Sequence, residues 1–179
     1  MTYWSILPHN PNSRFLRQKY PNIHLVIGGS VFNRHADVLH NKKPLFEQFF
    51  HSVVIYEGEL PLQRLIGQVS EGRPLQEVPN LIFFESGKIH RTATEKALPY
   101  EHLARPNFDQ LPLQHYLMPY PVLPYMASRG CYWGKCTFCT HSFIYDSYYR
   151  KENEQRVAED LDYLGKRYNT RYFTFSDEA

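Results

Sequence analysis

A run of prolines divides this chain into two parts. Between residues 92 and 124 the sequence contains Pro99, Pro106, Pro112, Pro119, Pro121 and Pro124. Proline lacks an amide hydrogen and fixes its own φ angle, so no helix or strand extends far through this stretch. We expect residues 96–123 to form a linker that wraps across a surface and is anchored by side chains such as Tyr100 and Tyr116. The linker then separates residues 1–95 from residues 124–179.

The first part alternates between strand and helix patterns. Residues 13–20 predict the end of a helix, with Phe15, Leu16 and Tyr20 on one apolar face. Leucine and other aliphatic side chains recur at helical spacing over residues 60–69. Short apolar runs predict strands at 23–27, 52–56, 81–84 and 88–91, the last two joined as a hairpin through Ser86 and Gly87. This order indicates an open α/β sheet.

The second part has the pattern of another α/β unit. Residues 124–128 predict a short strand, and residues 130–149 predict a long loop. A helix follows over residues 152–167, because Val157, Leu161, Leu164 and Tyr168 form one apolar stripe. Residues 171–175 predict the next strand.

The three cysteines of the chain all lie in the long loop, as Cys131, Cys136 and Cys139. An odd and tightly clustered set is a poor disulfide framework and is more typical of a metal or catalytic site. Thiolates favour iron–sulfur clusters or zinc. Three of them can bind three irons of a four-iron cluster, which leaves the fourth iron open to a small molecule. Gly130 and Gly134 permit the tight turns that such a loop needs.

Two other interpretations of the cysteines remain open. Cys131, Cys136, Cys139 and His141 could form a structural zinc site of the Cys₃His type. The cysteines could also be free thiols without a metal. In the first case the chain would be a zinc-stabilised binding module without redox activity.

The cysteine loop resembles the cluster-binding loop of the radical S-adenosylmethionine (SAM) superfamily. The resemblance rests on the sequence SRGC at residues 128–131 and on CTFC at residues 136–139. The usual spacing in that family is C-x3-C-x2-C, whereas this loop has one more residue between Cys131 and Cys136. The resemblance implies a [4Fe-4S] cluster that binds SAM at its open iron and cleaves it reductively to a 5′-deoxyadenosyl radical. It also implies that Phe138 packs near the SAM adenine.

The polar residues after the last predicted strand also resemble the family. Ser176, Asp177 and Glu178 stand where the second barrel strand of a radical SAM domain ends. The resemblance implies that these residues meet the SAM amino group, and a carboxylate is a suitable hydrogen-bond acceptor for an ammonium group. The alternative is an ordinary polar loop that caps a following helix.

Glycine-containing turns follow two predicted strands of the first part. The first turn is Gly28, Gly29 and Ser30, and the second is Glu57, Gly58 and Glu59. As a pair they are similar to the later half of the Rossmann-like cobalamin-binding domain found upstream of many radical SAM domains. The resemblance makes cobalamin a candidate cofactor, although Asp37 and His40 do not match the Asp-x-His-x-x-Gly motif of the best-known type. The alternative is that these glycines simply end strands.

Together these patterns predict an α/β chain in three segments. Residues 1–95 form a partial cobalamin-binding-type domain, 96–123 the linker, and 124–179 the N-terminal part of a TIM-like radical SAM barrel. A complete barrel needs more βα units than this chain holds, so we expect a truncated oxidoreductase or methyltransferase without turnover of its own. The expected partners are an electron donor, such as a flavodoxin or ferredoxin, and a complementary fragment.

The charge and hydropathy of the chain limit which partners and which cellular location we expect. The net charge of +2 comes without clustered Lys and Arg, so we expect no nucleic-acid partner. No apolar run is long enough to span a membrane. The first residues also lack the basic and apolar regions of a signal peptide, and we therefore expect a cytoplasmic location.

Overall fold

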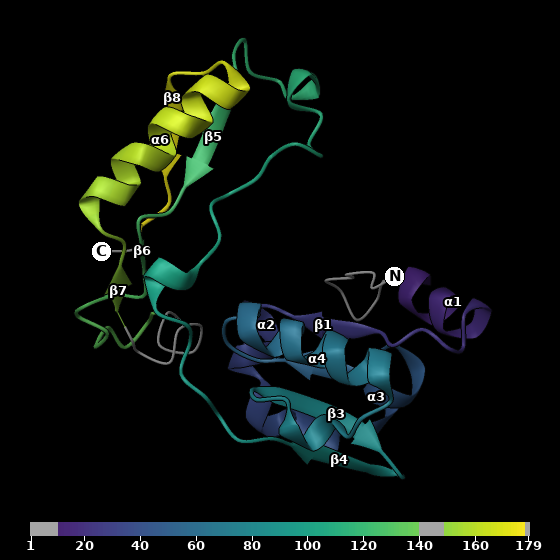
Figure 1. Cartoon of the computed structure of the whole chain (residues 1–179). Coiled ribbons are helices and arrows are strands. Elements are labelled where there is room, and N and C mark those ends of the chain that lie inside the picture. The colour runs from purple at the N-terminus through teal and green to yellow at the C-terminus, as the bar shows by residue number, and fades with distance from the viewer. Residues whose placement is uncertain (1–10, 140–148, 178–179) are drawn as a thin grey trace. The chain divides into compact units, whose positions relative to one another are not determined.

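The computed structural model describes residues 11–139 and 149–177, and its chain falls into two units (Figure 1). The described residues up to 97 form the first unit, and those from 98 onward form the second. None of the helices in these described ranges is long and apolar enough to cross a membrane.

The first unit is a mixed sheet with helices. Its elements in chain order are α1 (Pro11–Lys19), β1 (Val26–Gly28), α2 (Ser30–Arg34), the 3₁₀ helix η1 (Ala36–Asn41), α3 (Lys43–Gln48), β2 (Ser52–Val54), α4 (Glu59–Glu71), η2 (Leu75–Glu77), β3 (Leu81–Glu85) and β4 (Lys88–Arg91). The strand order is β1-β2-β3-β4. Strand β1 runs parallel to β2, whereas β3 and β4 are antiparallel to their neighbours.

The sheet is covered on both faces, which explains why β1, β2 and the first half of β3 are buried and mostly apolar. One face carries Ile27, Val53 and Ile82, which pack with side chains of α2, η1 and α3. The other face carries Val26 and Val54, which pack with α4 and with residues after it. The alternation follows from the strand geometry, because successive side chains point to opposite faces.

Most of the predicted elements of the first unit are present, with two differences. The hairpin is confirmed, and its turn residues Ser86 and Gly87 have φ angles of 50° and 81°, as a two-residue hairpin turn requires. The strand predicted from residue 23 begins only at Val26. The apolar face predicted for α1 is wrong for Phe15 and Tyr20, which are 54% and 42% exposed.

The second unit is built around one helix and two parallel strands. Its elements are η3 (Tyr100–His102), η4 (Leu113–His115), β5 (Val122–Tyr125), β6 (Ser128–Arg129), β7 (Arg150–Lys151), α6 (Glu154–Tyr168) and β8 (Tyr172–Phe175). Strand β5 pairs in parallel with β8, and β6 pairs antiparallel with β7. The predicted strand at 124–128 is thus two strands, and the first begins two residues earlier than expected.

Helix α6 connects β5 to β8 and packs on them (Figure 1). Its N-cap Asn153 accepts a hydrogen bond from the Gln155 amide at 2.8 Å, which satisfies one of the free amides of the first turn. The predicted stripe of Val157, Leu161, Leu164 and Tyr168 forms the core of this unit with Leu123 and Tyr125. The helix and its buried face are confirmed.

The proline-rich segment is fastened to this helix. Arg105 Nε donates to the buried carboxylate of Asp160 at 2.5 Å. The Phe108 amide donates to the Tyr168 hydroxyl at 2.8 Å. The Tyr100 hydroxyl donates to a backbone carbonyl, so this predicted anchor is present. Tyr116 is not an anchor, because its side chain is 55% exposed.

Candidate functional site

The base of the cysteine loop is a short antiparallel stem. Ser128 pairs with Lys151, and Arg129 pairs with Arg150. The Glu152 amide also donates to the Ala127 carbonyl at 2.7 Å. Because the two strands flank the loop, they bring its ends together and fix where the cysteine segment leaves the protein body.

The cysteine segment begins with a sharp turn and stays accessible. Gly130 has a φ of 81° and Gly134 a φ of 57°, a region that residues with a Cβ rarely adopt. Cys131 and Cys139 are half-buried, Cys136 is exposed, and all three are free thiols. The Cys139 amide donates to the Cys136 carbonyl at 3.2 Å, which closes a turn between the last two thiols.

The thiols do not converge into a ready-made metal site. Within residues 11–139 and 149–177, no group of three or more His, Cys, Asp and Glu side chains lies close enough to hold a metal ion. The donor set nevertheless fits an iron–sulfur cluster, because it offers accessible thiols on one turn-rich loop. His141, the fourth ligand of the zinc alternative, lies outside the described residues, and the described part of the chain gives that alternative no support.

Exposed aromatic residues alternate with the cysteines along the loop. Phe138, the predicted contact of the adenine, is 88% exposed. Trp133 is also exposed, with the Lys135 ammonium 5.5 Å from its ring centre. On the stem, the Arg129 guanidinium lies 6.0 Å from the Tyr100 ring centre. The loop thus presents flat apolar surfaces and positive charge next to its cysteines.

The polar residues after β8 lie beside this stem. Strands β5 and β8 are parallel, so the segments that follow them meet at one edge of the sheet. The Ser176 amide donates to the Tyr125 carbonyl at 3.0 Å, and the Ser176 side chain is exposed. Asp177 accepts hydrogen bonds from Ser128 Oγ at 2.5 Å and from the Ala127 amide at 3.3 Å. Glu178 lies outside the described residues.

The two glycine turns of the first unit also lie at a common edge. Gly28 ends β1 opposite Val54, the last residue of β2, so the turns Gly28–Gly29–Ser30 and Glu57–Gly58–Glu59 leave the sheet side by side. A Cβ on Gly28 would lie 3.0 Å from the Val54 carbonyl oxygen, so a side chain does not fit there. Gly29 has φ 107° and ψ 172°, a conformation almost restricted to glycine. Gly58 has a φ of −87° and needs no glycine.

Comparison with known proteins places this arrangement among characterised folds. No protein-family model matches the chain. The anaerobic magnesium-protoporphyrin IX monomethyl ester cyclase of Synechocystis sp. is 22% identical over 166 residues, which are 92% of this chain and 32% of the cyclase.

Solved structures match almost the whole chain. The radical SAM methyltransferase TsrM from Kitasatospora setae, with cobalamin and a [4Fe-4S] cluster bound, matches with a TM-score of 0.61 and 17% identity over 92% of this chain. The cobalamin-dependent radical SAM enzyme OxsB, with aqua-cobalamin and SAM bound, matches with a TM-score of 0.69 and 19% identity over 99% of this chain. The fold is that of cobalamin-dependent radical SAM enzymes.

These matches confirm the α/β fold class and the resemblance seen in the sequence. The chain spans about a third of the cyclase (32%), and 33% of TsrM and 25% of OxsB. It therefore corresponds to only a part of each of these proteins.

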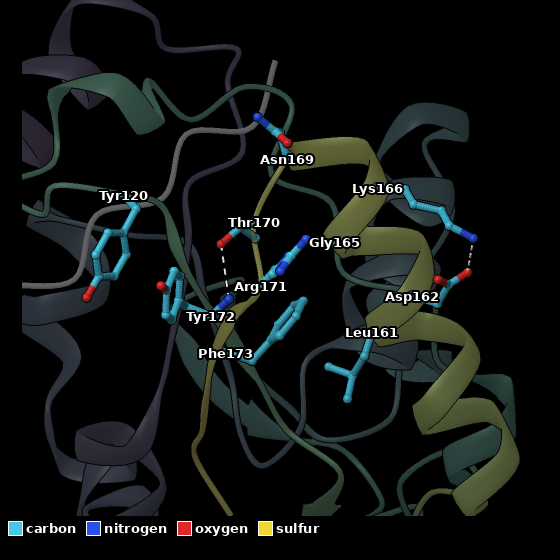
Figure 2. Close-up of a pocket in the computed structure, with 10 residues that line it drawn as sticks. All are labelled: Tyr120, Leu161, Asp162, Gly165, Lys166, Asn169, Thr170, Arg171, Tyr172 and Phe173. Atoms are coloured by element: carbon cyan, nitrogen blue, oxygen red, sulfur yellow. Dashed lines mark hydrogen bonds and ion pairs between the residues drawn. The ribbon is translucent and has the colours of Figure 1, made fainter.

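A hollow of about 740 Å³ in the second unit lies away from these candidate sites (Figure 2). It lies at the end of α6 and the start of β8, and Tyr120, Lys166 and Arg171 are among its lining residues. Asp162 and Lys166 form an ion pair at its rim at 2.6 Å (Figure 2). The cysteine stem contacts the opposite end of β8, so none of the predicted cofactor residues lines the hollow.

Several polar residues near the sites were not predicted from the sequence. Buried Asn33 accepts a hydrogen bond from the Tyr56 amide at 2.8 Å and so links α2, which follows the first glycine turn, to the residue before the second. Buried Asp160 accepts from Tyr125 at 3.1 Å, and burial together with this carboxylate raises the pKa of Tyr125. The available signal was a polar residue within an apolar pattern, since such residues are buried only with hydrogen-bond partners.

Proposed function

We propose that this chain is a radical SAM iron–sulfur protein in which Cys131, Cys136 and Cys139 ligate a [4Fe-4S] cluster. The observation that carries the proposal is the position of the chain's cysteines on a stem-closed loop, where the parallel strands β5 and β8 end. Sites in α/β folds lie at this edge of the sheet. The fold is shared with TsrM, whose structure contains a [4Fe-4S] cluster.

The residues around the loop have separable roles in this proposal. The three thiolates would hold three irons, and no cysteine remains for the fourth. When bound, such a cluster supplies the electron that cleaves SAM to a 5′-deoxyadenosyl radical. Exposed Phe138 would stack on the adenine, while Ser176 and Glu178 would face the SAM amino group. These side chains would bind and orient the ligand.

Cobalamin is the second cofactor that we propose. The turns Gly28–Gly29–Ser30 and Glu57–Gly58–Glu59 would accept its nucleotide tail, since they leave adjacent parallel strands at one edge of the sheet. The absence of a Cβ at Gly28 and Gly29 lets a ligand approach the backbone closely. TsrM and OxsB, which share the fold, have cobalamin bound in their structures.

The proposed activity belongs to a larger assembly in the cytoplasm. We infer an oxidoreductase or methyltransferase that receives electrons from a flavodoxin or ferredoxin. We propose that a complementary polypeptide contributes a further βα unit, which would cover the hollow beside α6 and β8 (Figure 2). Neither the charge nor the hydropathy of the chain favours a nucleic-acid or membrane partner.

The test is anaerobic purification and reconstitution with iron and sulfide, followed by electron paramagnetic resonance of the reduced protein with and without SAM. We expect about four irons per chain and a signal whose shape changes when SAM is added. Replacement of any cysteine by alanine should abolish this signal. Thr137→Ala is the matched control, because Thr137 is exposed and lies between two of the cysteines. Stoichiometric zinc without a cluster signal would refute the proposal in favour of the structural zinc module.

A further inference from the structure

The carboxylate of Asp177 contacts the root of the cysteine loop with both of its oxygens. One oxygen accepts the Ser128 hydroxyl at 2.5 Å, and the other accepts the Ala127 amide at 3.3 Å. Ser128 is buried, Asp177 is half-buried, and the two residues come from strands β6 and the end of β8. A hydrogen bond from a hydroxyl to an ionised carboxylate is shorter and stronger than one between neutral groups.

The same stretch of chain is held from its other side by β7. The Ala127 carbonyl accepts the Glu152 amide at 2.7 Å, and Ser128 pairs with Lys151. Both backbone groups of Ala127 are therefore engaged, one with the second residue after β8 and one with the residue after β7. The stem is fixed on two sides just before the chain turns at Gly130 toward Cys131.

Among the described residues, the contacts of the cysteine segment beyond the stem are local. Cys136 is exposed, the Cys139 amide donates to the Cys136 carbonyl, and the Tyr132 ring lies edge-on to Tyr149, just before β7. The position and direction of the first thiol then depend on the stem. A residue that anchors the stem controls where the thiols begin, although it does not touch them.

We propose that Asp177 is a positioning residue that clamps the root of the cysteine loop to the end of β8 through Ser128 and Ala127. This Asp177 clamp rests on the proposed function, because it places the thiols for the cluster that they are proposed to bind. It differs from the role expected from the sequence, in which Asp177 faces the SAM amino group. Since Ser128 is part of the clamp, the two roles predict different effects for its substitution.

The first experiment uses the full chain without a cluster. Hydrogen–deuterium exchange measured by mass spectrometry follows the amides of the stem and of the cysteine segment in Asp177→Asn and Ser128→Ala. Loss of a hydrogen bond to a charged group should speed exchange of the Ala127 amide about tenfold or more. Asp162→Asn is the control, because its carboxylate pairs with Lys166 on the exposed face of α6. It should leave the stem unchanged.

The second experiment measures the cluster in the reconstituted variants before SAM is added. We expect Asp177→Asn and Ser128→Ala to lose iron to a chelator about tenfold faster than the wild type, and to broaden the signal of the reduced cluster. The double variant should be no worse than Asp177→Asn alone, because Ser128→Ala removes only a hydrogen bond that Asp177→Asn already weakens. Ser128→Thr keeps the hydroxyl and should restore iron retention.

The outcomes separate the clamp from the proposed function. Unchanged stem exchange in both variants would overturn the clamp, whether or not the chain binds iron. A wild type without a cluster would overturn the proposed function, and the exchange data alone would then decide the clamp. A third outcome is also decisive. In it, Ser128→Ala matches the wild type in stem exchange and in iron loss, while Asp177→Asn alters only the change that SAM makes in the signal. Asp177 then acts on SAM, and the clamp is refuted. Should Asp177→Asn fail to fold, Ser128→Ala still decides.

Discussion

Two stacked histidines should make the first unit sensitive to mild acid. The ring centres of His24 and His51 are 5.1 Å apart. His24 Nε2 hydrogen-bonds Ser52 Oγ at 2.8 Å, and the Leu25 amide donates to His51 Nδ1 at 2.9 Å. A proton on His51 Nδ1 would face that amide hydrogen, so only the neutral ring can make this contact.

The pKa values of both rings follow from this environment. Burial, and then the charge of Arg17, lowers the pKa of His24 from 6.5 to about 4. The same two causes, with His24 in addition, lower the pKa of His51 to about 4. At pH values between about 4 and 6.5, the unfolded chain therefore binds more protons than the folded chain. Stability from the neutral rings is therefore complete above pH 6.5 and is lost as the pH falls toward 4.

The expected loss of stability can be estimated from this difference. Each pH unit between the folded and unfolded pKa values corresponds to about 1.4 kcal/mol per ring, or about 7 kcal/mol for two fully dry rings. Both rings keep part of their surface in water and titrate as a coupled pair, so we expect about 3 kcal/mol of the free energy of unfolding to be lost.

Urea unfolding at pH 7 and pH 4.5 tests this expectation. Hydrogen-exchange mass spectrometry of peptides from β1 and β2 reports on the first unit by itself. The double variant His24→Gln, His51→Asn keeps hydrogen-bond acceptors that do not titrate, and it should lose much less stability in acid than the wild type. His40→Asn, at an exposed position, is the control and should behave as the wild type. Equal acid losses in the wild type and the double variant would refute the reasoning.

Two further predictions concern stability at neutral pH. Asp160→Asn should destabilise the second unit by about 3 kcal/mol, because the buried side chain loses its charge opposite Arg105 and one of the two oxygens that accept from Arg105 and Tyr125. Urea unfolding followed by peptides from α6 measures this, and a loss near zero would contradict it. Gly29→Ala should lower the free energy of unfolding by about 1–3 kcal/mol through backbone strain. Gly58 has a φ of −87° and open space where a Cβ would lie, so Gly58→Ala should change this free energy by less than about 0.5 kcal/mol. Thermal unfolding by circular dichroism compares the two alanine variants, and equal effects would show that φ is not the cause.

The elements that could be predicted are those whose sequence pattern is complete within a short segment of the chain. Helices α4 and α6 were found because their apolar residues repeat at helical spacing. The β3–β4 hairpin was found because Ser86 and Gly87 tolerate the turn. The cysteine loop was found because a thiol cluster needs only a short segment of sequence.

The errors concern side chains whose surroundings come from elsewhere in the chain. Phe15 and Tyr20 were placed on a buried face, but only Leu16 of that group packs on the core. Tyr116 was expected to anchor the linker together with Tyr100; Tyr100 does so, but Arg105 takes the place of Tyr116. A helical repeat or an aromatic residue indicates a capacity for burial, and the partner that achieves it depends on the fold.

The sequence by itself determined the local part of this protein: the main helices and strands, and a thiol loop after a strand. Only the tertiary structure decided that Asp177, far along the chain, lies against Ser128 at the root of that loop. The parallel pairing of β5 with β8 decides it, because this pairing brings the ends of both strands to one edge of the sheet. Such a contact depends on register between distant segments, which leaves no periodic signal in the sequence.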